Sequence, residues 1–250
     1  MFLSLPKPVI IAHRGASSHA PENTLAAFRL AVEQGAAAIE LDVQLTADHE
    51  VVVFHDISLS RTTDGQGKIS DFNLAELEQL NAGVNFEPAY QGERIPTLAD
   101  VLDNIPDTIF LNIELKNLNT PTDVLPVKTA DLIRQFQAQQ RVLISSFNPL
   151  ALYKFQRQIP EVPCGRLLYS KLTIKLYELL PLLASGYQSI HLPFRALTRN
   201  IVRTFHERDL KVFAYTLNHP QDIIDAVETG VDGFFTDDPG FASRLLNNEN

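Results

Sequence analysis

A histidine and an arginine stand side by side at the end of the first apolar run of the chain. The run VIIAH covers residues 9–13, and Arg14 follows His13 directly. An imidazole accepts or donates a proton near neutral pH, and a guanidinium presents a planar fork to a pair of phosphate oxygens. The pair predicts proton transfer beside a bound anion, unless it is simply a strand end whose polar groups reach water.

Two carboxylates share one face of the next apolar run. AIELDVQL, residues 38–45, alternates like a strand, and successive side chains of a strand point to opposite sides. Glu40 and Asp42 therefore lie on one side, and the apolar residues between them lie on the other. Because the apolar side suits a layer of helices, we expect both carboxylates to point into a barrel.

A third carboxylate follows in IFLNIELK, residues 109–116, where the same alternation places Asn112, Glu114 and Lys116 inward. Three buried carboxylates repel one another and lose hydration, and a divalent cation removes both costs. Oxygen ligands without a thiolate or a clear histidine pair favour a hard ion, Mg2+ or alternatively Ca2+. The predicted metal ligands are Glu40, Asp42 and Glu114. An internal ion pair between Glu114 and Lys116 is the structural alternative.

A hairpin brings His55 to the same place. VVVFHD, residues 51–56, is separated from residues 38–45 by TADHE, which is too short for a parallel crossover. An antiparallel hairpin places His55 roughly opposite Leu41, beside the two carboxylates. We expect His13 and His55 to act as an acid–base pair, since one imidazole can take a proton while the other gives one.

These side chains need a fold that brings strand ends together. Strand-like runs alternate with amphipathic helical segments, which is typical of parallel strands with helices outside. Eight such units in 250 residues predict a TIM (β/α)8 barrel, whose active sites lie at the carboxyl ends of the strands. A doubly wound open sheet is the alternative, but no glycine-rich fingerprint follows the first run. The predicted barrel strands cover 9–13, 38–45, 109–116, 141–147, 164–169, 189–194, 211–218 and 232–238.

Residues 57–96 interrupt the regular alternation. They contain the turn-rich stretch RTTDGQGK and one short helix pattern with Leu74, Leu77 and Leu80. This stretch is too long for an ordinary loop. We predict a small inserted cap over the barrel mouth, within a single domain that covers 1–250.

Composition excludes several kinds of partner. The formal net charge of −9 argues against nucleic acid, because phosphate backbones demand basic patches. No apolar run approaches ~18 residues, the usual minimum for a membrane span, and the start MFLSLPKPVIIAH lacks the pattern of a signal peptide. Cys164 is the only cysteine and excludes an internal disulfide, so we predict a cytoplasmic protein.

Several short motifs recur along the chain in a definite order and spacing. In both respects the chain resembles the glycerophosphodiester phosphodiesterase family at HRG (13–15), PENT (21–24), ELD (40–42), HD (55–56), RTT (61–63), ELK (114–116), SF (146–147) and GVDGFFTDDP (230–239). The resemblance covers nearly the whole chain, including the inserted segment. It implies a TIM barrel that hydrolyses a small-molecule glycerophosphodiester to sn-glycerol 3-phosphate and an alcohol.

The resemblance also implies a role for each residue of the mouth. Its metal ligands would be Glu40, Asp42 and Glu114, its acid–base pair His13 and His55, and its phosphate-binding residues Arg14 and Lys116. The route usually drawn for the family has two steps, in which the glycerol 2-hydroxyl attacks phosphorus and water then opens a cyclic phosphate. We adopt this route as a hypothesis.

One motif departs from the family pattern. Members often carry Trp-Thr-Val-Asn on the seventh strand, whereas this chain has no tryptophan and reads Tyr215-Thr216-Leu217-Asn218 at that place. Tyr215 offers an aromatic wall to glycerol or to the departing alcohol, which leaves the substrate preference open. Phe147 and Tyr215 are thus either walls of the substrate site or core aromatics.

Other functions remain open interpretations. An apolar groove beside the mouth would favour a lysophospholipase-D-like activity on lysophospholipids, and a small polar pocket would favour water-soluble diesters. A barrel that binds phosphodiesters without turnover is disfavoured by the complete set of histidines and carboxylates. An isomerase or aldolase with a similar metal site has no evident use for two imidazoles beside Arg14 and Lys116.

Polar residues in two loops near the mouth also have open roles. Asp237 and Asp238 end the last strand, where capping of the final helix is as plausible as catalysis. After the first strand, Glu22 braces Arg14, and Asn23 or Thr24 caps the following helix.

Overall fold

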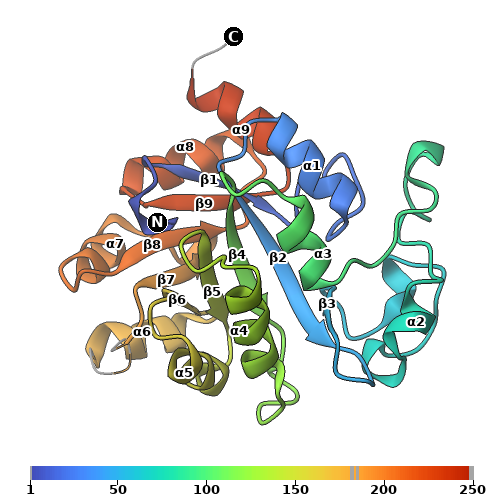
Figure 1. Ribbon diagram of the computed structural model, residues 1–250. Coiled ribbons are helices and arrows are strands. Elements are labelled where there is room, and N and C mark those ends of the chain that lie inside the picture. The colour runs from blue at the N-terminus through green and yellow to red at the C-terminus, as the bar shows by residue number, and fades with distance from the viewer. Residues whose placement is uncertain (1, 181–182, 184–185, 248–250) are drawn as a thin grey trace.

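Parallel strands close into a barrel because the first strand pairs with both the second and the last. The computed structural model describes residues 2–180, 183 and 186–247 (Figure 1). Its strands are β1 (Val9–His13), β2 (Ala38–Leu45), β3 (Val51–Val53), β4 (Phe110–Leu115), β5 (Val142–Ser146), β6 (Cys164–Leu167), β7 (Ser189–Pro193), β8 (Lys211–Tyr215) and β9 (Gly233–Thr236). Their order is β1-β9-β8-β7-β6-β5-β4-β2-β3, with β1 also paired to β2. The predicted TIM barrel is confirmed, and β3 forms the expected antiparallel hairpin with β2.

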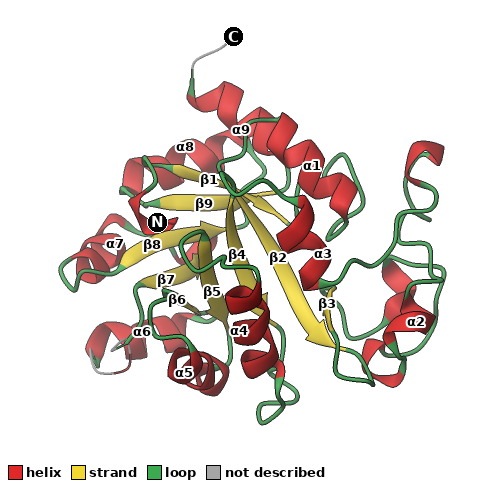
Figure 2. Cartoon of the chain, in the orientation of Figure 1, coloured by secondary structure: helices red, strands yellow, loops and turns green. Residues whose placement is uncertain are grey.

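Helices surround the barrel on its outer side, except for the short helix of the inserted segment (Figure 2). The helices are α1 (Leu25–Glu33), α2 (Leu74–Leu77, in the inserted segment), α3 (Leu98–Asn104), α4 (Leu125–Gln135), α5 (Pro149–Gln158), α6 (Lys171–Leu179), α7 (Arg199–His206), α8 (Pro220–Thr229) and α9 (Pro239–Leu246). Local signals set their ends: Pro220 opens α8, and Gly230 closes it in the left-handed conformation at φ 89°. Among the described residues, every helix is too short or too polar to span a bilayer.

The barrel interior changes character from one end to the other. Its lower part is an apolar cluster in which Ile11, Leu143 and Phe213 meet Phe2 from the N-terminal turn. Phe2 packs edge-on against Phe213, with ring centroids 6.1 Å apart. Two residues further along the strands, the alternation brings polar side chains inward. The apolar layer therefore supports a polar layer at the carboxyl ends.

The inserted segment 57–96 packs beside the barrel, next to the β2–β3 hairpin (Figure 1). It contains α2 and three short 3-10 helices, and its own apolar cluster joins Leu59, Ile69 and Leu77 to Val52 of β3. The pocket at the barrel mouth is lined by residues that all lie outside 57–96. The segment therefore flanks the pocket instead of forming its wall.

Candidate active site

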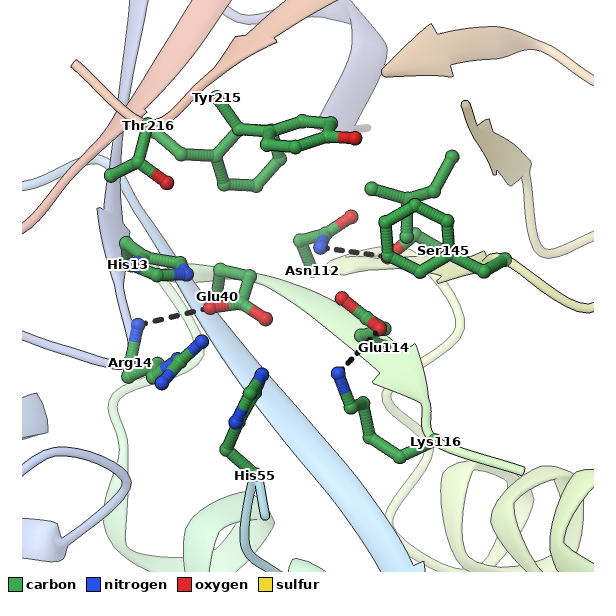
Figure 3. Close-up of a pocket in the computed structure, with 13 residues that line it drawn as sticks. His13, Arg14, Glu40, His55, Asn112, Glu114, Lys116, Ser145, Tyr215 and Thr216 are labelled. Atoms are coloured by element: carbon green, nitrogen blue, oxygen red, sulfur yellow. Dashed lines mark hydrogen bonds and ion pairs between the residues drawn. The ribbon is translucent and has the colours of Figure 1, made fainter. Parts of the chain in front are cut away.

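A pocket of about 220 Å³ lies at the carboxyl ends of the barrel strands (Figure 3). Every residue predicted for acid–base chemistry, phosphate binding or an aromatic wall lines it: His13, His55, Arg14, Lys116, Phe147 and Tyr215. Glu40 and Glu114 of the predicted metal group line it as well. The structure thus brings together side chains from β1, β2, β4, β5, β8 and the end of the hairpin.

The three carboxylates form one cluster. Oxygens of Glu40, Asp42 and Glu114 all lie within 4.8 Å of one another. The register explains this, because parallel pairing of β2 with β4 sets Asp42 beside Glu114. Glu40 and Asp42 are buried, with 3% and 1% of their surfaces exposed. The inward orientation expected from strand alternation is therefore observed.

The electrostatics of this cluster fit a bound cation. Burial raises the pKa of Glu40 well above its ordinary value, and repulsion from Asp42 and Glu114 adds to the shift. Burial also raises the pKa of Glu114. For Asp42 burial opposes ionisation, but Lys116 and Arg14 outweigh it and lower its pKa to about 2. Two buried carboxylates and the partly buried carboxylate of Glu114 offer oxygen ligands whose negative charge is only partly compensated, which suits a hard divalent ion.

Arg14 and Lys116 lie against the same carboxylates. The Arg14 Nε atom is 3.3 Å from Asp42 Oδ2. Lys116 Nζ is 3.1 Å from Glu114 Oε1, a contact that Figure 3 marks with a dashed line. Burial lowers the pKa of each cation, but the neighbouring carboxylates more than offset this and leave both values raised. Glu22 braces Arg14 as expected, since Nη1 donates to Glu22 Oε1 at 2.8 Å. Both cations are thus charged and held at the pocket wall.

Each histidine of the pocket is held by a carboxylate. His13 Nδ1 lies 2.7 Å from Asp237 Oδ1, and His55 Nδ1 lies 2.6 Å from Asp56 Oδ1. An ionised carboxylate only accepts hydrogen bonds, so each Nδ1 carries a hydrogen and each Nε2 is the ring nitrogen left for proton transfer. Burial lowers the pKa of His55. Each ring is therefore oriented by a carboxylate that accepts a hydrogen bond from Nδ1.

Arg61 connects the carboxylate beside His55 to the carboxylate that holds Arg14. Its Nε donates to Asp56 Oδ2 at 2.5 Å, while Nη1 and Nη2 donate to the two oxygens of Glu22 at 2.7 Å each. Hydrogen bonds from Arg61 lower the pKa of Asp56 to about 2, with a further contribution from His55. A continuous chain of charged pairs thus runs from His55 to Arg14.

Polar residues in two loops have roles that the sequence left open. Thr24 is the residue that caps α1, because its hydroxyl accepts a hydrogen bond from Ala27 N. Asn23 instead donates from Nδ2 to Asp42 Oδ2 at 2.9 Å, from a left-handed backbone at φ 59°. Asp238 caps α9, whereas Asp237 contacts His13. The sequence placed Asp237 near the mouth but carried no signal for its partner.

Aromatic rings form one wall of the pocket. Phe147 and Tyr215 meet edge-on, with centroids 6.3 Å apart and an interplanar angle of 89°. The Tyr215 hydroxyl donates to Leu168 O at 2.7 Å, so this polar group is satisfied and the ring serves as an apolar surface. Asn112 also lines the pocket, and its Oδ1 is buried without a hydrogen-bond donor among the described residues.

Two imidazoles, each held by a carboxylate, lie beside two cations in this pocket. Such a set of side chains suits the hydrolysis of phosphate esters, so the barrel belongs to the class of phosphate-ester hydrolases. Comparison with known proteins gives the family. The model of the glycerophosphoryl diester phosphodiesterase family matches residues 13–241, and the chain belongs to this family. It is accordingly a phosphoric diester hydrolase.

Individual relatives agree along almost the full length. The chain is 39% identical over 241 residues to a glycerophosphodiester phosphodiesterase of Caldanaerobacter subterraneus subsp. tengcongensis, covering 96% of this chain and 98% of the relative. Among solved structures, an Oleispira antarctica phosphodiesterase in complex with the product sn-glycerol-3-phosphate superposes with a TM-score of 0.87 and 34% identity. The match covers 96% of this chain and 97% of that one. The glycerophosphodiester phosphodiesterase of Agrobacterium tumefaciens gives a TM-score of 0.80 at 30% identity, over 94% and 99% of the two chains.

Proposed function

We propose that the chain hydrolyses glycerophosphodiesters to sn-glycerol 3-phosphate and an alcohol in a metal-dependent reaction. The proposal rests above all on one observation: two imidazoles, three clustered carboxylates and two cations surround a single pocket. The product named for the Oleispira antarctica phosphodiesterase, sn-glycerol-3-phosphate, supports the same chemistry here.

The histidines would carry the protons in both steps. One imidazole Nε2 takes the proton of the glycerol 2-hydroxyl as this oxygen forms a bond to phosphorus, and the other protonates the alcohol oxygen as its bond to phosphorus breaks. Water then opens the cyclic phosphate with the proton transfers reversed. Asp237 and Asp56 hold the two rings in the required tautomer. Arg14 and Lys116 neutralise the phosphate oxygens.

The proposed cofactor is one divalent cation, Mg2+ with Ca2+ as the alternative, at Glu40, Asp42 and Glu114. When bound, such an ion lowers the pKa of a coordinated hydroxyl and neutralises charge on the phosphate. The chain supplies the clustered oxygens for it, and Asn23 orients Asp42 through two hydrogen bonds. Phe147 and Tyr215 form the proposed aromatic wall of the substrate site.

Two further predictions belong to the same account. We propose that 1–250 forms one barrel domain with 57–96 as an insertion. The cytoplasmic location stays a prediction, which rests on the single cysteine of the chain.

Release of glycerol 3-phosphate from glycerophosphocholine and glycerophosphoethanolamine tests the proposal. We expect EDTA to abolish release, and added Mg2+ or Ca2+ to restore it. His13→Ala and His55→Ala should each lose ~10²–10⁴-fold in rate, the usual scale for acid–base groups. His49→Ala, at an exposed position of the β2–β3 turn, is the matched control and should keep wild-type activity. Chelator-insensitive hydrolysis would contradict the metal site.

A further inference from the structure

A second hollow adjoins the active-site pocket on its outer side. It measures about 330 Å³, and four lining residues belong to both hollows: His55, Glu114, Lys116 and Phe147. The outer hollow continues between the segment that follows β3 and the loop that follows β4. We call it the outer groove and define it by Ile57, Leu115, Leu118 and Phe147.

Large aliphatic side chains are exposed in the outer groove. Ile57 is 51% exposed and Leu118 is 58% exposed, although each comes from a different segment of the mouth. Apolar side chains that stay uncovered in a concave site next to reactive groups mark contact with a ligand. The polar amide of Gln44, which also lines the groove, is used by hydrogen bonds from Nε2 to two backbone carbonyls. Of the lining residues that can carry a charge, His55, Glu114 and Lys116 lie where the groove meets the pocket.

The two histidines of the pocket differ in their relation to the outer groove. His13 lines only the inner pocket, whereas His55 lines both hollows. Leu167, Phe235 and Tyr215 line only the inner pocket. A glycerol phosphate moiety placed there leaves the outer groove as the path for a longer substituent on the alcohol.

We propose that the outer groove binds an apolar chain on the leaving alcohol, so that the favoured substrates are glycerophosphodiesters whose alcohol carries a hydrocarbon chain. This inference rests on the proposed function, because it takes His55 as the group beside the departing oxygen. Burial of hydrocarbon in the groove adds binding energy at a distance from phosphorus. The rate should therefore depend on chain length while the chemistry stays the same.

A series of glycerophospho-n-alkanols, from ethanol to decanol and used below their micelle concentrations, tests this inference. For a half-open groove we expect kcat/KM to rise about twofold per added methylene, since full burial of a methylene is worth about fourfold. Ile57→Ser and Leu118→Ser should each flatten this rise. Leu172→Ser is the matched control at an 80% exposed leucine outside the groove, and it should leave the rise unchanged.

The outcomes separate this inference from the proposed function. Release of glycerol 3-phosphate from glycerophosphoethanol at a rate equal to that from the long-chain diesters would overturn the groove while the proposed function stands. A preference that follows a chain on the glycerol carbons instead would overturn the assignment to the alcohol side. Failure to release glycerol 3-phosphate from every diester would overturn both.

Discussion

Asp237→Asn tests whether Asp237 positions His13 for catalysis. The neighbouring residue Asp238 caps α9 and serves as the comparison. Asp237 Oδ1 lies 2.7 Å from His13 Nδ1, and Oδ2 accepts a hydrogen bond from Asn218 Nδ2 at 2.6 Å. Burial opposes ionisation of Asp237, but the hydrogen bond from His13 helps to lower its pKa. Asparagine keeps the shape and removes the charge. Its amide can donate to Nδ1 and so favours the tautomer whose Nε2 carries the hydrogen.

The size of the expected loss in kcat follows from these contacts. Loss of a charge-assisted hydrogen bond costs about 1.5–3 kcal/mol, and a wrong tautomer in a comparable carboxylate–histidine pair costs about 10⁴ in kcat. We therefore expect Asp237→Asn to lower kcat by roughly 10²–10⁴-fold with a small change in KM, since the proposed role of His13 is proton transfer in the transition state. The assay is initial-rate release of glycerol 3-phosphate from glycerophosphocholine.

Asp238→Asn is the matched control, because Asp238 is the next residue and caps α9 through Phe241 N at 2.8 Å. Asparagine is an equally good cap, so this variant should keep both kcat and stability. The reasoning fails if Asp237→Asn turns over at a nearly normal rate, or if the two variants lose activity to the same extent.

Three further predictions concern charged residues around the site and at the opposite end of the barrel. Arg61→Ala should lower kcat about 10-fold, because it releases the two carboxylates that Arg61 bridges. Arg61→Lys should not restore the rate, because a lysine cannot make both bidentate contacts. Full activity in either variant would contradict a role for the ion pairs of Arg61. Glu40→Gln should raise the melting temperature of the metal-free protein by relieving carboxylate repulsion and should abolish the further rise on adding Mg2+; an undiminished Mg2+ effect would contradict the metal cluster. Burial opposes ionisation of Asp232, but contacts with Lys7 and His206 help to lower its pKa, so its stabilisation is present above the unfolded pKa of ~3.9 and is lost as the pH falls through the folded value. Urea unfolding of Asp232→Asn should show a loss of roughly 2 kcal/mol near neutral pH that shrinks in acid, and a loss independent of pH would contradict this.

Periodicity was sufficient to predict the barrel and the face of each strand. Alternation alone placed Glu40 and Asp42 inward, and the short turn predicted the hairpin. The hairpin pairs Val43 with Val53, which is the register that the expected placement of His55 opposite Leu41 requires. These predictions succeed because they depend on local chain geometry, in which a strand repeats every two residues.

Pairings between distant loops could not be predicted in this way. The contact of His13 with Asp237 joins residues 224 positions apart and exists only because the barrel closes between β1 and β9. Asn23 resembles a helix cap in sequence, but its left-handed backbone turns the amide to Asp42. Alternation predicts the face on which a side chain lies, whereas its hydrogen-bond partner depends on loop conformation.

Tyr215 shows why the choice between core residue and substrate wall was open. Its hydroxyl is tied to Leu168 O, as in a core tyrosine, while its ring lines the pocket beside Phe147. The hydroxyl of Tyr215 thus behaves like that of a core residue, and its ring behaves like a wall of the pocket. Only the three-dimensional position of the β6 end, which supplies the acceptor carbonyl, settles how the ring is held.

We propose that one imidazole acts as a general base and the other as a general acid. A change of leaving group tests this assignment most directly. Turnover of glycerophosphocholine should fall ~10²–10⁴-fold in both His13→Ala and His55→Ala. With a 4-nitrophenyl diester of glycerol phosphate, whose leaving group needs no proton, one variant should regain most of its rate. The outer groove lies beside His55, so His55→Ala is the variant expected to recover. Rescue of both variants, or of neither, would contradict an acid and a base acting across one pocket.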